Sequence, residues 1–77
     1  MNKDRRSRLE DIAGQLEFLK ADIESIHEEE YEAYSNLPES IQESERGEAM
    51  SENCDTLEEI VSNLEDVISS LNELAEQ

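Results

Sequence analysis

The sequence is poor in the residues on which small enzymes and secreted domains depend. One cysteine and one histidine in 77 residues allow no internal disulfide and leave too few ligands for a zinc site. No apolar run approaches the roughly 18 residues of a membrane span, and no signal-peptide pattern is present. Below about 80 residues we expect no core that could enclose an active-site cleft. We therefore expect a cytoplasmic, non-enzymatic protein with no metal, cofactor or membrane segment.

Basic residues are also scarce. Lys plus Arg number 6 against 22 Asp plus Glu, so the net charge is -16. Four of the six basic residues lie within residues 1–8, and residues 9–77 carry 21 acids against two basic residues. Such a polyanion repels nucleic acid and anionic membranes and attracts basic surfaces. We expect no direct nucleic-acid binding and a partner protein with a basic surface.

With one proline and two glycines, long stretches contain no helix breaker. Heptad spacing in the first half predicts a helix over about residues 5–34. Its seam takes Leu9 as position a and Ile12 as position d, and Tyr31 and Tyr34 are predicted to close the helix pair beside the turn. The predicted seam consists of Leu9, Ile12, Leu16, Leu19, Ile23 and Ile26.

The second half predicts a helix over about residues 45–76 with a wider apolar stripe. Positions a and d hold Met50, Cys54, Leu57, Val61, Leu64, Ile68, Leu71 and Ala75. A further apolar row at position g holds Ile60, Val67 and Leu74. One partner helix is too narrow to cover all three rows.

Residues 35–44 predict a turn with a short helical segment. Asn36 and Ser40 are candidate N-caps, because each is followed three residues later by Glu, and Ser44 is a third candidate. Pro38 suits the first turn of a short helix. Two helices of similar length joined by a short connection predict an all-α, coiled-coil-like antiparallel hairpin, in a single domain over residues 1–77.

The antiparallel arrangement also accounts for the basic N-terminal segment. Arginines are unfavourable at the positive end of their own helix dipole. In a hairpin, Arg5, Arg6 and Arg8 lie beside the end of the second helix. There we expect them to meet Glu73, Glu76 and the free C-terminal carbonyl groups.

An apolar association face is predicted on the second helix, where Ile60, Val67 and Leu74 stay uncovered. Self-association into a dimeric four-helix bundle is the simplest way to cover them. A different protein on that face is the other. Phe18 points away from the predicted seam; it is either part of a contact surface or a cover for the bundle edge.

Acidic residues recur every seven positions along the second helix. Position f holds Glu45, Glu52, Glu59, Asp66 and Glu73, and position e holds Glu58 and Glu65. Seven residues advance a helix by about 10.5 Å, so position f forms a line of carboxylates along the rod. The row is either a solvated face or a mimic of nucleic acid that occupies a basic groove. The near-absence of interspersed lysine is the argument for the mimic.

Three further candidates are weaker. Glu24 and His27 have the Glu-x-x-His spacing of di-iron bundles, but both lie off the predicted seam. Cys54 lies at position a, where we expect a buried thiol that acts as a small hydrophobic residue. No phosphate-binding loop, catalytic triad or paired carboxylates in a cleft can be proposed.

Two short motifs, Asn36-Leu37-Pro38-Glu39 and Ser44-Glu45-Arg46-Gly47, lie within residues 28–50. With them, this stretch resembles small acidic proteins encoded by phages and mobile elements of Firmicutes. The resemblance implies a phage-like setting, in which small acidic proteins often act against host nucleic-acid enzymes, including defence systems.

The leading hypothesis is a phage-type inhibitor or nucleic-acid mimic that blocks a basic surface of a nucleic-acid-handling or defence protein. The acids at positions e and f of the second helix would carry the binding. The alternative is a structural or adaptor bundle that binds a partner through the apolar face of the second helix.

Overall fold

The computed structural model describes all 77 residues, and every regular element in it is a helix. Helix α1 spans Lys3–Ser35, α2 spans Glu39–Gln42 and α3 spans Glu45–Ala75. The prediction of an all-α chain is confirmed. Compared with the expected bounds, α1 starts two residues earlier and α3 ends one residue earlier.

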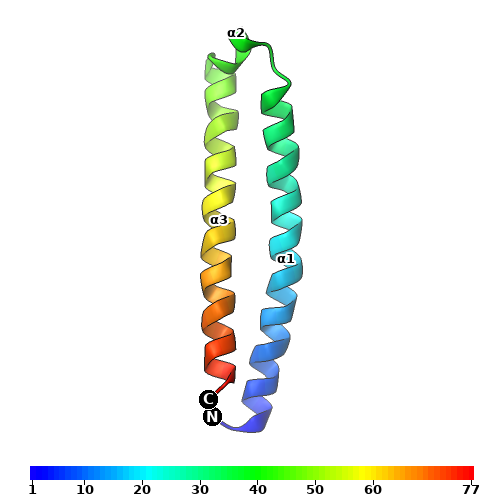
Figure 1. The fold of residues 1–77 in the computed structure, drawn as a ribbon, viewed down its shortest axis with the longest axis vertical. Helices are drawn as coiled ribbons and strands as arrows, with labels where there is room; N and C mark the ends of the chain where they lie inside the picture. Colours follow the sequence, from blue (N-terminus) through cyan, green and yellow to red (C-terminus); the bar gives the residue numbers. More distant parts are fainter.

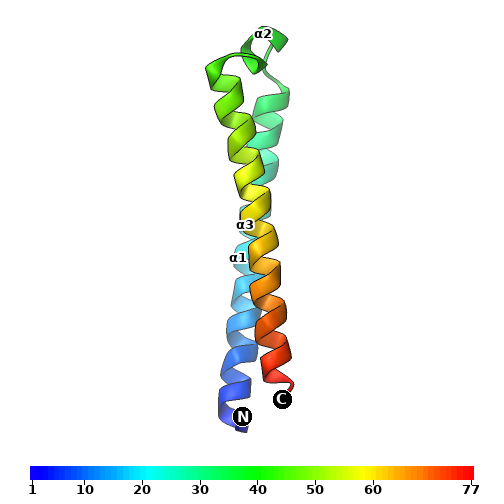
Figure 2. The ribbon, with the colours of Figure 1, turned by 90° about the vertical axis from the view of Figure 1, so that its left-hand side faces the viewer.

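The two long helices lie side by side and run in opposite directions, with α2 at one end and both termini at the other (Figure 1). Seen from the side, α3 crosses α1 at a shallow angle (Figure 2). The Cα atoms extend over 58 × 14 × 12 Å. Because no further layer covers the pair, each long helix exposes most of its circumference. None of the helices is long and apolar enough to cross a membrane.

Side-chain caps explain where the two long helices begin. The side-chain oxygen of Asn2 accepts a hydrogen bond from the backbone N–H of Arg5 at 2.9 Å, at the start of α1. The hydroxyl of Ser44 accepts one from the backbone N–H of Gly47 at 3.5 Å, at the start of α3. The prediction of Ser44 as an N-cap is confirmed.

The other two N-cap predictions are wrong. Asn36 is the C-cap of α1, and Ser40 lies inside α2. Pro38 takes the N-cap position of α2, and its carbonyl accepts hydrogen bonds from the backbone N–H groups of Ile41 and Gln42. Proline disfavours the helical conformation in the residue before it, so the break falls immediately before Pro38 and α2 starts after it.

Gln42 and Gly47 hold the turn against the ends of the long helices. The Nε2 of Gln42 donates to the carbonyl groups of Tyr34 at 3.1 Å and Ser35 at 3.4 Å. These are carbonyl groups that the end of α1 leaves without a helical partner. Gly47 is buried, and a Cβ atom there would overlap the backbone carbonyl of Gln42. A residue without a side chain is therefore required in this first turn of α3.

Helix α3 presents the predicted row to α1. Its covered apolar side chains, buried or half-buried, are Met50, Cys54, Leu57, Val61, Leu64, Ile68, Leu71 and Ala75. The heptad pattern of this helix therefore predicted its packing face, and the seam residues are the ones that the sequence placed at positions a and d.

Helix α1 is rotated relative to the prediction. Its predicted d residues Ile12, Leu19 and Ile26 are exposed. The residues that follow them are covered instead: Ala13 is buried, and Lys20 and His27 are half-buried. The seam of α1 thus runs through positions a and e, which corresponds to a rotation of about 50° from the predicted seam.

The hydrophobic core is small. Ala13, Cys54, Ile68 and Ala75 are its only buried apolar residues, and no large side chain is fully buried. A single pair of helices can cover only one strip on each. Much of the apolar surface of both helices therefore stays open, and its position decides what the molecule can bind.

Candidate interaction surfaces

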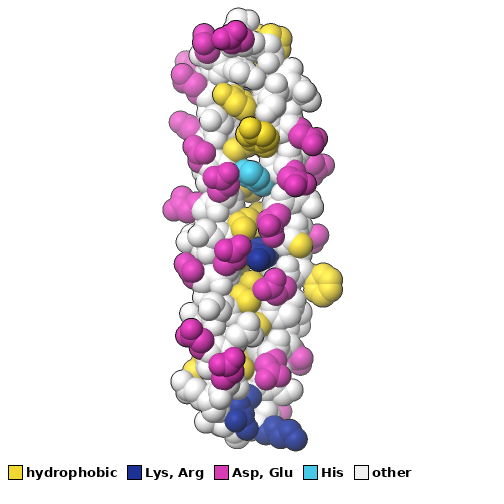
Figure 3. All heavy atoms as spheres, viewed as in Figure 1, with side chains coloured by type: hydrophobic (Ala, Val, Ile, Leu, Met, Phe, Trp, Pro, Cys, Tyr) yellow, Lys and Arg dark blue, Asp and Glu magenta, His cyan; other side chains and the backbone are white.

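One broad face of the rod is lined with carboxylates from both helices. Figure 3 shows them along the two sides of the groove between α1 and α3, with lysine and histidine side chains between them. The Nζ of Lys20 lies 3.5 Å from the Oε1 of Glu65 and 3.7 Å from the Oε2 of Glu17. Only 17% of the Lys20 side chain is exposed. This face is called the acid-lined face below.

His27 lies one heptad beyond Lys20 and approaches Glu58, which lies one heptad before Glu65. Its Nε2 is 3.3 Å from the Oε1 of Glu58. The atom is shielded from solvent but forms no hydrogen bond, so the contact is a close approach without hydrogen-bond geometry. The sequence placed His27 off the seam; the structure places it in the seam. The contact between His27 and Glu58 is an ion pair only when His27 is protonated.

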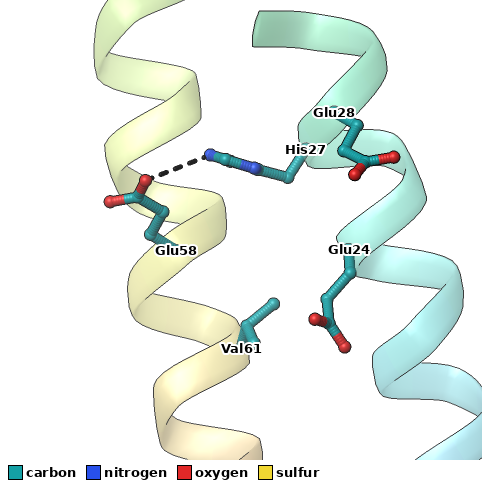
Figure 4. Close-up of a pocket in the computed structure, with 5 residues that line it drawn as sticks. All are labelled: Glu24, His27, Glu28, Glu58 and Val61. Carbon is teal, nitrogen blue, oxygen red and sulfur yellow. Dashed lines mark ion pairs between the residues drawn. The ribbon is translucent and has the colours of Figure 1, made fainter.

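A depression of about 230 Å³ surrounds His27. Figure 4 shows His27 reaching from α1 towards Glu58 on α3, while Glu28 points away from that pair. Glu24 and Val61 complete the lining. No group of three or more His, Cys, Asp or Glu residues is arranged to hold a metal ion. Of Glu24 and His27, only His27 forms a polar contact with α3, through Glu58.

At the open end of the rod, one of the three arginines reaches across to α3. The Nη1 of Arg6 donates a hydrogen bond to the backbone carbonyl of Gln77 at 2.9 Å. Arg8 instead pairs with Asp4 of its own helix, with 3.2 Å between Nε and Oδ2. The predicted contact with C-terminal carbonyl groups is confirmed for Arg6, and the arginines form no ion pair with Glu73 or Glu76.

The seven acids that the sequence placed on one binding face divide into two groups. Glu58 and Glu65, at position e, face the groove and contact His27 and Lys20. The five residues at position f are exposed, and none of them forms an ion pair or side-chain hydrogen bond within the chain. This outer acidic row consists of Glu45, Glu52, Glu59, Asp66 and Glu73.

The broad face opposite the acid-lined face carries apolar rows from both helices. Ile12 and Leu74 line one depression of about 310 Å³, which places these two residues on the same side of the rod. Because both helices repeat in heptads and run antiparallel, residues seven and fourteen positions away lie on that side too. This apolar face consists of Ile12, Leu19 and Ile26 of α1 and Ile60, Val67 and Leu74 of α3.

The heptad pattern predicted that Ile60, Val67 and Leu74 of α3 stay uncovered. It placed Ile12, Leu19 and Ile26 of α1 in the seam, whereas the structure exposes them. The signal was present. Lys20 and His27 are seven residues apart, as are their acidic partners Glu58 and Glu65. Matching these two spacings in an antiparallel pair places position e of α1 in the seam and turns Leu19 and its equivalents outwards.

Two aromatic residues lie away from the apolar face. Phe18 is 79% exposed, and it lies about 100° around α1 from Leu19, on the outer side of the helix. Tyr31 is also exposed and stacks on His27, with 6.4 Å between the ring centroids and 20° between the ring planes. Tyr34 is half-buried beside the turn. Phe18 is therefore separate from the apolar face.

Cys54 is a buried free thiol, as predicted. Burial raises the pKa of the Cys54 thiol, and the nearby carboxylates of Glu30, Asp55 and Glu58 raise it further. A nucleophilic cysteine requires the opposite shift. The environment of Cys54 therefore favours the neutral, unreactive form.

No protein-family model, curated protein or solved structure matches this chain. What it binds is therefore inferred from its own residues and geometry.

Proposed function

We propose that the protein is a non-enzymatic interaction module whose outer acidic row binds a basic surface of another protein. The observation that carries this proposal is the absence of any partner for these five carboxylates within the chain. Unpaired acids in a row repel one another and destabilise the isolated fold. A basic surface would remove that repulsion and release bound counterions.

The linear charge density favours a site built for nucleic acid. A net charge of -16 over 58 Å corresponds to about one negative charge per 3.6 Å. A DNA strand carries one charge per roughly 3.4 Å. The rod as a whole therefore has a linear charge density close to that of one DNA strand. The outer acidic row alone contributes one carboxylate per heptad, about 10.5 Å apart, and the acids on the other faces supply the rest. We propose that the rod blocks a basic surface of a nucleic-acid-handling or defence protein by occupying it.

The biological setting proposed is that of a phage or mobile element acting in the host cytoplasm. It is supported by the resemblance of residues 28–50 to small acidic phage proteins. It is also supported by charge, because a strong polyanion suits inhibition of enzymes that bind nucleic acid. The finer architecture we propose is a two-helix hairpin that dimerises into a four-helix bundle.

The test is a comparison of two triple variants with the same change in net charge. Glu52→Lys, Glu59→Lys and Asp66→Lys reverse the outer acidic row. Asp11→Lys, Glu28→Lys and Glu32→Lys reverse three exposed α1 acids that form no ion pair, and they serve as the control. Each protein is immobilised and used to capture proteins from a bacterial lysate, and the captured proteins are eluted with a DNA duplex.

The outer-row variant is expected to lose the captured proteins while keeping its helical circular dichroism, and the control to keep them. Elution should also follow increasing salt, because screening weakens contacts between exposed charges. Retention by the outer-row variant, or equal loss from both variants, would contradict the proposal. Equal loss would mean that net charge alone governs binding.

A second candidate function is a structural or adaptor bundle that holds a partner through the apolar face. The observation in its favour is the exposure of Ile60, Val67 and Leu74 on α3. Binding of this kind would survive high salt and be lost on Leu74→Glu. Binding through the outer acidic row would show the reverse pattern.

A further inference from the structure

We propose that the apolar face is the surface through which two copies of this chain pair, antiparallel, with α1 against α1 and α3 against α3. This inference rests on the proposed dimeric bundle and specifies its interface. The interface it names includes α1 residues that the heptad pattern had assigned to the seam, and it excludes Phe18.

The apolar face has the composition of an interface core. Its six large aliphatic side chains are each between 39% and 54% exposed. Both helices contribute equally spaced residues, with one from each helix in every layer along the rod. Clustered exposed aliphatic residues of this kind mark association sites on soluble proteins. Arg5 and Arg8 lie at the end of the face beside the termini, where they line the same depression as Ile12 and Leu74.

The borders of the face favour a second copy of the chain over a different partner. On α3, the neighbouring outer positions hold Ala49, Thr56, Asn63 and Ser70, none of which is charged. The border positions themselves therefore bring no carboxylate between two α3 helices, and Asp66 of the outer acidic row lies at the edge of this border, where it lines one depression with Val67 and Ser70. Elsewhere on this polyanion, almost any contact between two copies would place acid against acid.

On α1, the outer border carries charges that complement their own antiparallel copy. The residues in order are Arg8, Gln15, Asp22 and Glu29. A two-fold axis through Leu19 places Arg8 opposite Glu29 of the second copy, and Gln15 opposite Asp22. The same axis passes through Val67 on α3 and places Asn63 opposite Ser70. Arg8 is available for this contact, because its pairing with Asp4 is solvent-exposed.

A two-fold axis through Leu19 allows the two rods to overlap extensively. Leu19 lies at the midpoint of α1, which spans Lys3–Ser35, so a two-fold axis there overlaps the two rods along most of their length. The six aliphatic residues extend over the fourteen positions from Ile12 to Ile26, so the apolar contact occupies about 21 Å in the middle of the 58 Å rod.

Pairing in this way leaves the outer acidic row free. Position f of α3 points away from α1 at the edge of the rod, so a dimer displays two such rows on its outside. The two associations also respond oppositely to salt. Screening weakens binding of the acidic row to a basic partner, and it strengthens pairing between two polyanions through an apolar face.

The first experiment follows isoleucine methyl groups by NMR during dilution of the full chain. Ile12, Ile26 and Ile60 lie on the proposed interface, whereas Ile23 and Ile68 lie in the seam and Ile41 lies in the turn. Dilution is expected to shift the first three signals together, with smaller changes at the other three. Signals that do not change with concentration in a chain of monomer mass, or changes centred on Ile41, would overturn the proposal.

The second experiment tests the interface and its orientation by sedimentation equilibrium. Leu19→Gln with Val67→Gln is expected to reduce the mass from twice 8.8 kDa to 8.8 kDa. Phe18→Gln, also on an exposed apolar residue of α1, should stay dimeric. A dimeric double variant with wild-type affinity would overturn the interface. If the double variant does not fold, the methyl dilution series still decides.

A charge swap tests the antiparallel orientation. Arg8→Glu and Glu29→Arg are each expected to weaken dimerisation about threefold to tenfold, and the combination to restore it, because each pairs with the other on the second copy. Restoration supports the antiparallel arrangement. Failure of the combination to recover affinity overturns it. Neither result depends on the outer acidic row, so failure here is distinguishable from failure of the proposed function.

Discussion

The acid-lined face and the apolar face lie on opposite sides of one helix pair, and they differ in the side chains that border the seam between α1 and α3. On the acid-lined face, Lys20 and His27 leave the seam at an edge crowded with carboxylates. On the apolar face, Leu19 and Val67 are about half exposed, and the border beside Val67 is uncharged whereas the border beside Leu19 carries both basic and acidic residues. The same heptad repeats therefore place charged side chains on one side of the helix pair and exposed aliphatic side chains on the other.

This difference explains the rotation of α1. A helix pair that covers Lys20 and exposes Leu19 is not arranged for the greatest apolar burial within one chain. Exposed or partly exposed ion pairs contribute about 0–1 kcal/mol each, whereas full burial of a Leu or Ile side chain contributes about 1.5–3 kcal/mol. The arrangement is favourable overall when the exposed rows are covered by a second molecule.

The largest expected effect on stability comes from a substitution in the turn, which sets the register of α1 against α3. Gly47→Ala places a Cβ against the Gln42 carbonyl, so the turn must shift. We expect a loss of about 2 kcal/mol or more in the free energy of unfolding, measured by urea denaturation. Gly14→Ala is the control, because nothing lies within 4 Å of its Cβ position. It should gain about 0.5–1 kcal/mol in helix propensity. Equal effects would contradict the turn geometry.

The next effect separates the seam from the apolar face with a single type of substitution. Ile68→Ala removes a side chain that is 4% exposed, and Ile60→Ala removes one that is 39% exposed. We expect a loss of about 2–4 kcal/mol for Ile68→Ala and under about 1 kcal/mol for Ile60→Ala, in urea titrations at concentrations where the chain is monomeric. At concentrations where the chain pairs, Ile60→Ala should become more costly. A cost independent of concentration would argue against pairing.

A smaller effect distinguishes the groove acids from the outer acidic row, using two adjacent residues. Glu65→Gln removes the partner of Lys20 and should cost up to about 1 kcal/mol. Asp66→Asn removes an unpaired carboxylate from a row of like charges and should gain a few tenths of a kcal/mol at low salt. Thermal unfolding at low and high salt measures both. A change in stability of the same sign for the two variants would contradict the division of the acids into two groups.

The smallest effect concerns pH and Cys54. Its pKa is raised in the folded chain, so the unfolded thiol ionises first as the pH rises. Unfolding then releases a proton, and this contribution to stability is present below the ordinary thiol pKa of 9.0 and is lost as the pH rises through the folded value. Urea midpoints of the wild type should therefore fall above about pH 9 more steeply than those of Cys54→Ala. Parallel pH profiles would contradict the shift.

The sequence predicted the helices, the α3 seam and the outer acidic row, because each depends on a repeat within a single helix. It did not predict the rotation of α1, because apolar counting ranks Ile12 above Ala13 and Leu19 above Lys20. The choice depends on what α3 presents, and Glu65 and Glu58 lie opposite Lys20 and His27. The rotation of α1 depends on its contacts with α3, so it cannot be predicted from the pattern of α1 alone.

The capping residues show the same limit at shorter range. Asn36, Ser40 and Ser44 all have the side chain of an N-cap, and only Ser44 takes the role at a helix start. Pro38 restricts the residue before it, so α1 ends ahead of that residue and Asn36 becomes its C-cap. Pro38 also takes the N-cap position of α2, which leaves Ser40 inside that helix. N-cap propensity alone identifies three candidate residues, and the position of Pro38 determines that two of them do not take the role.

The central claim is that the two faces serve two different associations, an apolar one between copies and an acidic one with a basic partner. Sedimentation equilibrium of the wild-type chain at low and at high sodium chloride tests it most directly. The account predicts a dimer whose dissociation constant falls as salt is added, because screening reduces repulsion between the polyanions. A monomer under both conditions, or a dimer that salt dissociates, would contradict it.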